Sequence, residues 1–285
     1  MMRVGCAISN MLNKPLREVP VPFLLGLAGL ISLFGLLLPE GARFGNDWRN
    51  VRLDLLAPPF AAGSLYPPHV VLFTPHVVLP EALSIFVQSV LLIGTLLVLI
   101  WQFNGTVAAL LLTLGNPAAL WAIQIGQLDW IAALALLLPA PLAGLALTAK
   151  PQAMFGIVLL WVRRRTWANF ATAVVALGLG VCLYGAWWQL NNLPAEAWAW
   201  SVSIFPFGVP AALYFAWRAW HAQRAAVMWA VLIAPLASPY FALYSLAPVL
   251  AVVCSQNRRL GAWLVLAFWY LFFYTMLREV NSGRF

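Results

Sequence analysis

Ionisable residues occur at only a few points of a very apolar sequence. Asp47, Arg49 and Arg52 lie together in the polar stretch 45–54, between two hydrophobic segments. A carboxylate can accept a proton from a hydroxyl group, and arginines bind phosphate oxygens through several N–H donors at once. This stretch therefore predicts a general base next to cations that hold a phosphate group.

Two further polar sites interrupt apolar segments downstream. Gln127 and Asp129 follow Gly126, and Lys150 stands between the apolar segments 142–149 and 153–162. A charge with such apolar flanks is costly in a membrane, so it is either functional or paired with an opposite charge. A purely structural salt bridge between Lys150 and Asp129 is therefore the alternative interpretation.

The residues of the stretch 45–54 also have structural interpretations. Asp47 is of a residue type that caps the start of a helix, and Arg49 and Arg52 are of the type that contacts lipid headgroups. If the stretch is helical, Trp48, Val51 and Leu55 share one face. Such a helix is expected to lie along the membrane surface.

Metal and cofactor chemistry find no support in the sequence. His69 and His76 are the two histidines of the apolar piece 68–80, and two ligands without a nearby third do not make a zinc site. The sequence has no phosphate-binding loop, dinucleotide fingerprint or Cys-x-x-Cys pair. We therefore expect neither a metal ion nor a cofactor.

The composition excludes an ordinary soluble globular protein. The chain has 285 residues, of which 64% are hydrophobic and 8% charged, whereas soluble domains carry roughly a quarter charged residues. Its formal charge of +8 is concentrated in short loops, where basic residues set membrane orientation. We therefore predict an integral membrane protein that does not bind nucleic acid.

We predict an all-α fold, a polytopic transmembrane helical bundle that forms a single domain over residues 1–285, with about 9 to 11 hydrophobic segments. Residues 1–18 form a cytoplasmic tail because their basic residues precede the first span, 19–38. Residues 40–67 then form the first external loop, which carries Asp47 in a short amphipathic helix. The remaining segments are 81–103, 106–118, 128–138, 142–149 with 153–162, 167–188, 203–220, 225–236, 240–254 and 260–277.

Several of these segments are too short to cross a bilayer alone. Segments of about 8 to 13 residues make roughly 12 to 20 Å of helix, against a hydrocarbon core of about 30 Å. Proline-containing breaks separate them at residues 115–117, 139–141 and 150–151. Broken helices are tolerated at membrane depth where the freed backbone groups are buried or line a polar cavity, so we expect a site there.

Five short motifs follow one another along nearly the whole chain. They are Asp47-Trp48; Tyr66-Pro67-Pro68 with Pro75 and Leu79-Pro80; Gly126-Gln127; Ala143-Gly144 with Lys150-Pro151 and Arg163-Arg164-Arg165; and Ser238-Pro239 with Pro248. With these motifs in this order, the chain resembles the GT-C superfamily of integral-membrane glycosyltransferases. It is most similar to glycosyltransferase family 87, the polyprenyl-phosphate-mannose-dependent mannosyltransferase-like proteins.

The resemblance implies a GT-C-like fold and an inverting hexosyltransferase. The enzyme would take a hexose, mannose first of all, from a polyprenyl-phosphate donor. It would pass the sugar to a lipid-linked or cell-envelope glycan acceptor on the external face. Asp47 would be the general base, and Arg49, Arg52 and Lys150 would bind the donor phosphate.

The resemblance also nominates residues that would bind substrate hydroxyl or phosphate groups: Tyr66, His69, Gln127, Asp129, Tyr240 and Tyr244. The chain departs from the family in two ways. It is shorter than its members commonly are, and Tyr244 stands near the position where the family tends to have a histidine after Ser-Pro. Tyrosine donates a hydrogen bond but supplies no positive charge at neutral pH.

These inferences place the protein in a bacterial-type inner or plasma membrane, with a cytoplasmic N-terminus and an external active site. Its expected partners are the sugar donor, the glycan acceptor and membrane lipids, and its oligomeric state stays open. The alternative is a non-catalytic membrane protein, either a lipid or solute transporter or a structural subunit of a membrane complex.

Overall fold

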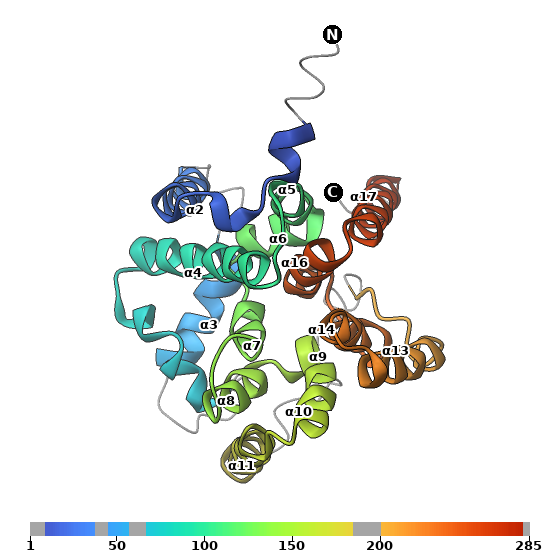
Figure 1. Cartoon of the computed structure of the whole chain (residues 1–285). Coiled ribbons are helices and arrows are strands. Elements are labelled where there is room, and N and C mark those ends of the chain that lie inside the picture. Colours follow the sequence, from blue (N-terminus) through green and yellow to red (C-terminus); the bar gives the residue numbers. More distant parts are fainter. Residues whose placement is uncertain (1–8, 38–44, 57–66, 185–200, 282–285) are drawn as a thin grey trace.

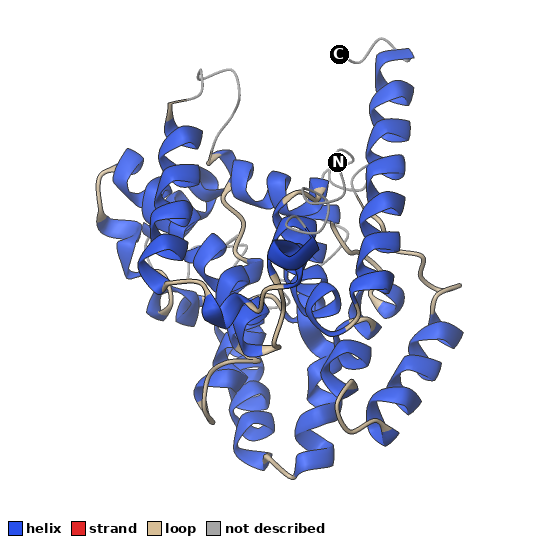
Figure 2. Cartoon of the chain, turned by 45° about the horizontal axis from the view of Figure 1, so that its top comes forward, coloured by secondary structure: helices blue, strands red, loops and turns tan. Residues whose placement is uncertain are grey.

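The computed structural model describes residues 9–37, 45–56, 67–184 and 201–281. Within these residues the regular structure is helical, and two isolated β-bridges, Pro15 to Thr106 and Ser201 to Ala242, are the only extended pairings (Figures 1 and 2). The predicted all-α fold is confirmed at this level. Tyr66 lies outside the described residues, so its role stays a prediction.

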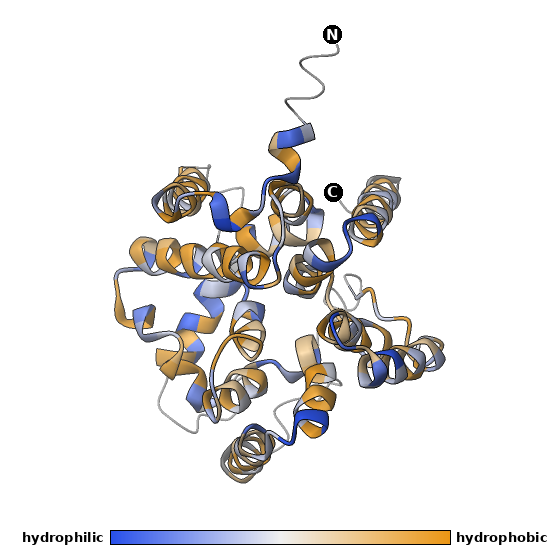
Figure 3. Ribbon diagram, viewed as in Figure 1, coloured by the Kyte–Doolittle hydropathy of each residue, from blue (hydrophilic) through white to orange (hydrophobic). Residues whose placement is uncertain are grey.

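One helix of the described chain is long and apolar enough to cross a membrane by itself. This is α4 (Glu81–Gln102), with 22 residues, and the shorter apolar helix α2 (Val21–Leu36) packs along it. Leu25 and Leu30 on α2 are 59% and 65% exposed. Figure 3 shows that hydrophobic residues, in orange, are common on the outer helices. Exposed apolar helix faces of this kind indicate a membrane protein.

Two bent helix pairs confirm predicted breaks. α5 (Val107–Leu114) and α6 (Pro117–Ile125) meet at 63°, and α8 (Leu142–Ala149) meets the helix that starts at Pro151 at 110°. Asn116 caps α6 by accepting a hydrogen bond from the Ala118 N–H at 2.8 Å. Each break falls before a proline because proline has no N–H and disfavours helical geometry in the preceding residue.

The other elements follow the predicted segments, with shorter helices where the sequence is interrupted. The predicted segment 128–138 contributes only the six-residue α7, and 225–236 is divided into α14 and α15. Their bounds are η1 (Leu16–Glu18), α3 (Asn46–Leu56), η3 (Pro68–Leu72), η4 (Pro75–Val78), α7 (Asp129–Leu134), α9 (Pro151–Met154), η5 (Phe155–Ile157), α10 (Val158–Arg164), α11 (Trp167–Tyr184), α13 (Val209–His221), α14 (Ala226–Val231), α15 (Ile233–Ala237), η7 (Leu243–Ser245), α16 (Leu246–Gln256) and α17 (Arg258–Asn281).

The core of the bundle lies around α16, α4 and α7. Every residue of α16 from Leu246 to Cys254 is buried, because this helix packs against α4, α5, α6 and α17. α7 lies between α4 and α8 and also contacts α9 (Figure 1). A helix that is apolar on all sides can be buried on all sides. The short polar connections next to α7 are thereby held at the centre of the molecule.

The helix α3 is formed as predicted, and the face that carries Trp48 and Val51 packs against protein. Trp48 and Val51 are buried where α3 contacts α4, α6 and η4. The Trp48 indole N–H donates to Ser84 Oγ at 2.9 Å, and its ring stacks on His76 with centroids 4.8 Å apart. A buried indole N–H needs such a partner, which lipid chains do not provide.

Gly126 makes the close contact between α3 and α6 possible. It has a φ of +74°, and a Cβ atom at this position would lie 2.8 Å from Trp48 Cβ. We therefore expect Gly126→Ala to lower the free energy of unfolding by about 1–3 kcal/mol. Thermal unfolding of the purified protein in detergent measures this.

The matched control is Gly94→Ala in α4, where an added Cβ meets no atom within 4 Å. Alanine favours the helix over glycine, so this variant is expected to be no less stable than wild type. Equal stability of the Gly126 and Gly94 variants would contradict the packing of α3 on α6.

Candidate functional site

Four polar residues predicted separately from the sequence meet in one cluster. The Gln127 side-chain amide donates to Asp47 Oδ2, and its oxygen accepts a hydrogen bond from Lys150 Nζ at 3.0 Å. Lys150 Nζ also donates to Asp129 Oδ2 at 2.8 Å. We call Asp47, Gln127, Asp129 and Lys150 the polar cluster. Within it, one amide group joins the carboxylate of α3 to the buried ammonium.

The local sequence explains how these side chains converge. Gly126 ends α6 in a left-handed conformation, so Gln127 leaves the helix and α7 begins at Asp129. Lys150 has φ −152° and ψ 72°, which lies outside the helical region, between α8 and Pro151. Helical geometry is disfavoured for a residue that precedes proline. Two interruptions that the sequence encodes therefore place an amide, a carboxylate and an ammonium side by side.

The charged pair at the centre of the cluster is almost completely buried. Lys150 is 6% exposed and Asp129 is 1% exposed. Asp129 Oδ1 has no hydrogen-bond partner among the described residues. The salt bridge between Lys150 and Asp129 is thus confirmed. The Lys150 ammonium also bonds Gln127, which contacts Asp47. The salt bridge therefore does not exclude a functional role for Lys150.

A loop from the C-terminal half closes over Lys150. The ammonium lies 4.8 Å from the centroid of the Tyr244 ring, within the range of a cation–π interaction. Ser238 Oγ donates to the Gln152 carbonyl at 3.3 Å, which ties the loop to the helix break. Tyr240 forms a side-chain hydrogen bond with Tyr244 in the same loop.

Asp47 is the half-buried carboxylate of the cluster. Burial raises its pKa above the ordinary aspartate value, with Asp129 acting in the same direction, while Lys150 and the bond from Gln127 oppose this rise. A carboxylate with a raised pKa is a stronger base than an exposed aspartate. The helix begins at Asn46, so Asp47 lies inside the first turn and the N-cap interpretation is wrong.

Gln88 holds the polar cluster from behind, and the sequence analysis missed it. Its amide nitrogen donates to the carbonyls of Gly126 and Gln127 at 3.1 and 2.9 Å. Its oxygen lies 3.2 Å from His76 Nε2, so the histidine must be the donor in that contact. Ser84 and Gln88 are four residues apart in a largely apolar helix, which is a signal of one polar helix face.

The two histidines of the apolar piece have separate partners. His69 Nε2 lies 2.9 Å from Thr148 Oγ1, which itself donates to the Leu145 carbonyl, so His69 is the donor to the hydroxyl. Burial lowers the pKa of His69 and of His76, and each is therefore neutral at pH 7. The described residues contain no group of three or more metal-ligating side chains. Lys150 is thus the cation that the structure joins to Asp47.

The two predicted phosphate-binding arginines of α3 have partners of their own. Arg49 pairs with Glu81 at 2.7 Å on the surface. Arg52 donates to the carbonyls of Val77 and Leu79 at 2.9 and 3.0 Å. These contacts attach α3 to η4 and to the start of α4. Hydrogen bonds to neutral carbonyls position the Arg52 guanidinium without cancelling its charge.

Comparison with protein-family models, with curated proteins and with solved structures gave no match. The resemblance to glycosyltransferase family 87 is therefore a prediction from the motifs alone.

The buried pair makes a testable contribution to stability. Asp129→Ala leaves the Lys150 ammonium buried without its carboxylate, so we expect a loss of about 3–5 kcal/mol in the free energy of unfolding. The double variant Asp129→Leu with Lys150→Met removes both charges and is expected to regain most of this loss. Thermal unfolding in detergent measures both effects.

Glu81→Ala is the matched control because it breaks an ion pair whose side chains are 41% and 53% exposed. Such a surface pair contributes about 1 kcal/mol or less. If Asp129→Ala were as mild as Glu81→Ala, Lys150 and Asp129 would not form a buried pair.

Proposed function

We propose that the protein is an inverting membrane glycosyltransferase. It would move a hexose, with mannose as the first choice by family resemblance, from a polyprenyl-phosphate donor to a hydroxyl of a lipid-linked or cell-envelope glycan. One observation carries the proposal: the Gln127 amide contacts both the Asp47 carboxylate and the Lys150 ammonium. A base and a phosphate-binding cation, the two groups that this reaction needs, are therefore one side chain apart.

In the proposed reaction, Asp47 takes the proton from the acceptor hydroxyl. The acceptor oxygen then attacks the anomeric carbon of the sugar from the face opposite the lipid phosphate. The bond from that carbon to the phosphate oxygen breaks, and its electron pair leaves with the polyprenyl phosphate. Lys150, with Arg49 and Arg52 as further cations, stabilises the negative charge that develops on the leaving oxygen.

The position of Lys150 suits a cation that exchanges partners. Its interaction with the Tyr244 ring is of a kind worth about 0.5–2 kcal/mol. A hydrogen bond to a charged phosphate oxygen contributes about 1.5–3 kcal/mol. A donor phosphate can therefore replace the ring without breaking the bond to Asp129. Tyr244 and Tyr240 would then bind hydroxyl groups of the sugar.

The burial of the Asp47 carboxylate favours a catalytic role over a stabilising one. A desolvated carboxylate lowers the stability of the folded protein at neutral pH, because its pKa is raised above the value in the unfolded chain. Replacing Asp47 with asparagine removes that cost. A carboxylate kept at such a position is therefore best explained by what it does to a substrate.

The direct test is a transfer assay with the purified protein in lipid. Polyprenyl-phosphate-linked mannose and a mixed glycolipid acceptor pool are supplied, and wild type is compared with Asp47→Asn. We expect transfer by wild type, a loss of at least about 100-fold in turnover for the variant, and thermal stability at or above wild type. A structural subunit or transporter would tolerate this substitution, so normal function in the variant would contradict the proposal.

The pH dependence of transfer provides a second test. The base must be unprotonated, so kcat/KM is expected to fall as pH falls through the pKa of Asp47. Because that pKa is raised, the fall should come above the range of an exposed aspartate, about pH 3.9. Measurement of kcat/KM between pH 4 and 8, with unfolding followed in parallel, shows it. A profile that is flat down to pH 4 while the protein stays folded would contradict Asp47 as base.

A further inference from the structure

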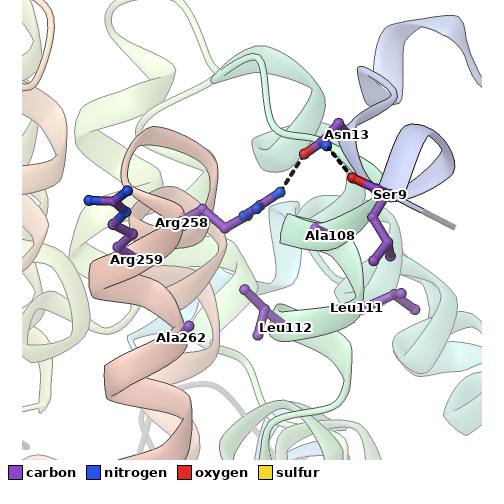
Figure 4. A pocket seen from close by; sticks show the side chains of 9 residues that line it. Ser9, Asn13, Ala108, Leu111, Leu112, Arg258, Arg259 and Ala262 are labelled. Atoms are coloured by element: carbon purple, nitrogen blue, oxygen red, sulfur yellow. Dashed lines mark hydrogen bonds between the residues drawn. The ribbon is translucent and has the colours of Figure 1, made fainter. Parts of the chain in front are cut away.

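A second polar site lies at an open groove formed by the helical residues 9–13, α5 and the first turn of α17 (Figure 4). Its volume is about 640 Å³. No member of the polar cluster lines it. The described residues that line it include Asn13, Leu111, Leu112, Arg258, Arg259 and Ala262.

The rim of this groove is positively charged. Arg258 and Arg259 are both exposed, and none of the described lining residues is acidic. Arg258 reaches across the groove and donates to Asn13 Oδ1 at 2.5 Å, while Arg259 extends from the other flank of the same helical turn (Figure 4). A guanidinium has five N–H donors, so this bond leaves Arg258 able to bind an anion.

The floor of the groove is apolar. Leu111 is 55% exposed, and Leu112 points from α5 toward Ala262 on α17 (Figure 4). The first-turn N–H groups of α17 add partial positive charge at the rim. A positive rim over an apolar floor complements a molecule with a negative head and a hydrocarbon tail. A small soluble anion would gain nothing from the floor.

The neighbouring sequence adds further positive charge. Lys14 and Arg17 follow residues 9–13, and the Lys14 carbonyl accepts a hydrogen bond from Val107 N at 3.0 Å, which fixes this segment next to α5. The expected orientation places this end of the bundle in the cytoplasmic leaflet. Anionic phospholipids are concentrated there, and basic pockets between transmembrane helices bind their headgroups.

We infer that this groove binds an anionic phospholipid. The lipid phosphate lies against Arg258, which reaches across the groove, and Arg259 on the other flank of the same turn adds to the positive charge. One acyl chain lies along Leu111, Leu112 and Ala262. This site is separate from the proposed transferase site and does not depend on that activity. It would anchor α17 and the N-terminal segment to the same lipid molecule.

The test uses native mass spectrometry of the full-length protein, purified in detergent and titrated with phosphatidylglycerol or phosphatidylcholine. Wild type is expected to retain phosphatidylglycerol preferentially. The double variant Arg258→Gln with Arg259→Gln should weaken phosphatidylglycerol binding at least about fivefold, because one basic residue near an anionic lipid surface contributes about that factor. Ala262→Leu, which fills the groove and keeps both charges, should also weaken binding.

The control is the double variant Arg164→Gln with Arg224→Gln, which removes two exposed arginines outside the groove. It is expected to bind phosphatidylglycerol as wild type does. Equal retention of both lipids by wild type, or wild-type binding by the Arg258 and Arg259 variant, would overturn the inference. So would an equal loss in the control, or displacement of the lipid by glycerol phosphate at matched concentration.

Discussion

The constraint on which the rest of the site depends is the buried ammonium of Lys150. A charge at this depth is tolerated only if it is paired and its hydrogen bonds are satisfied. Asp129 and Gln127 from the α6–α7 connection and the ring of Tyr244 from η7 meet this requirement from two distant parts of the chain. The helix breaks around α6, α7 and α8 are therefore more than interruptions of membrane spans. They are what lets distant segments reach one ammonium group.

The packing of α3 brings a second carboxylate, that of Asp47, next to the buried pair of Lys150 and Asp129. Trp48 inserts next to Ser84 and His76, and its packing requires a glycine at position 126. The same helix turn places Asp47 against the Gln127 amide. Gln88 bonds the backbone of the Gly126–Gln127 turn from the other side. The carboxylate is thus held by two layers of hydrogen bonds, which suits a group that must keep its position during catalysis.

The sequence was sufficient to predict the broken helices and the central members of the site. Proline marks each confirmed break, and Gln127, Asp129 and Lys150 stood out because polar residues are rare among such apolar flanks. The sequence could not show which surface the apolar face of α3 covers. An amphipathic stripe is the same whether it meets lipid or protein, and the contact of Trp48 with Ser84 depends on the tertiary fold. Gln88 was missed because its amide nitrogen binds the backbone carbonyls of Gly126 and Gln127, and residue types alone cannot indicate a backbone partner.

The central claim is that Asp47 and Lys150 act on opposite sides of one displacement at the anomeric carbon. The anomeric configuration of the transferred sugar tests it most directly. The product made by wild type from polyprenyl-phosphate-linked mannose of defined configuration is analysed by NMR spectroscopy. We expect the inverted configuration. Retention of configuration, or bound donor that is never transferred to any glycolipid acceptor, would contradict it.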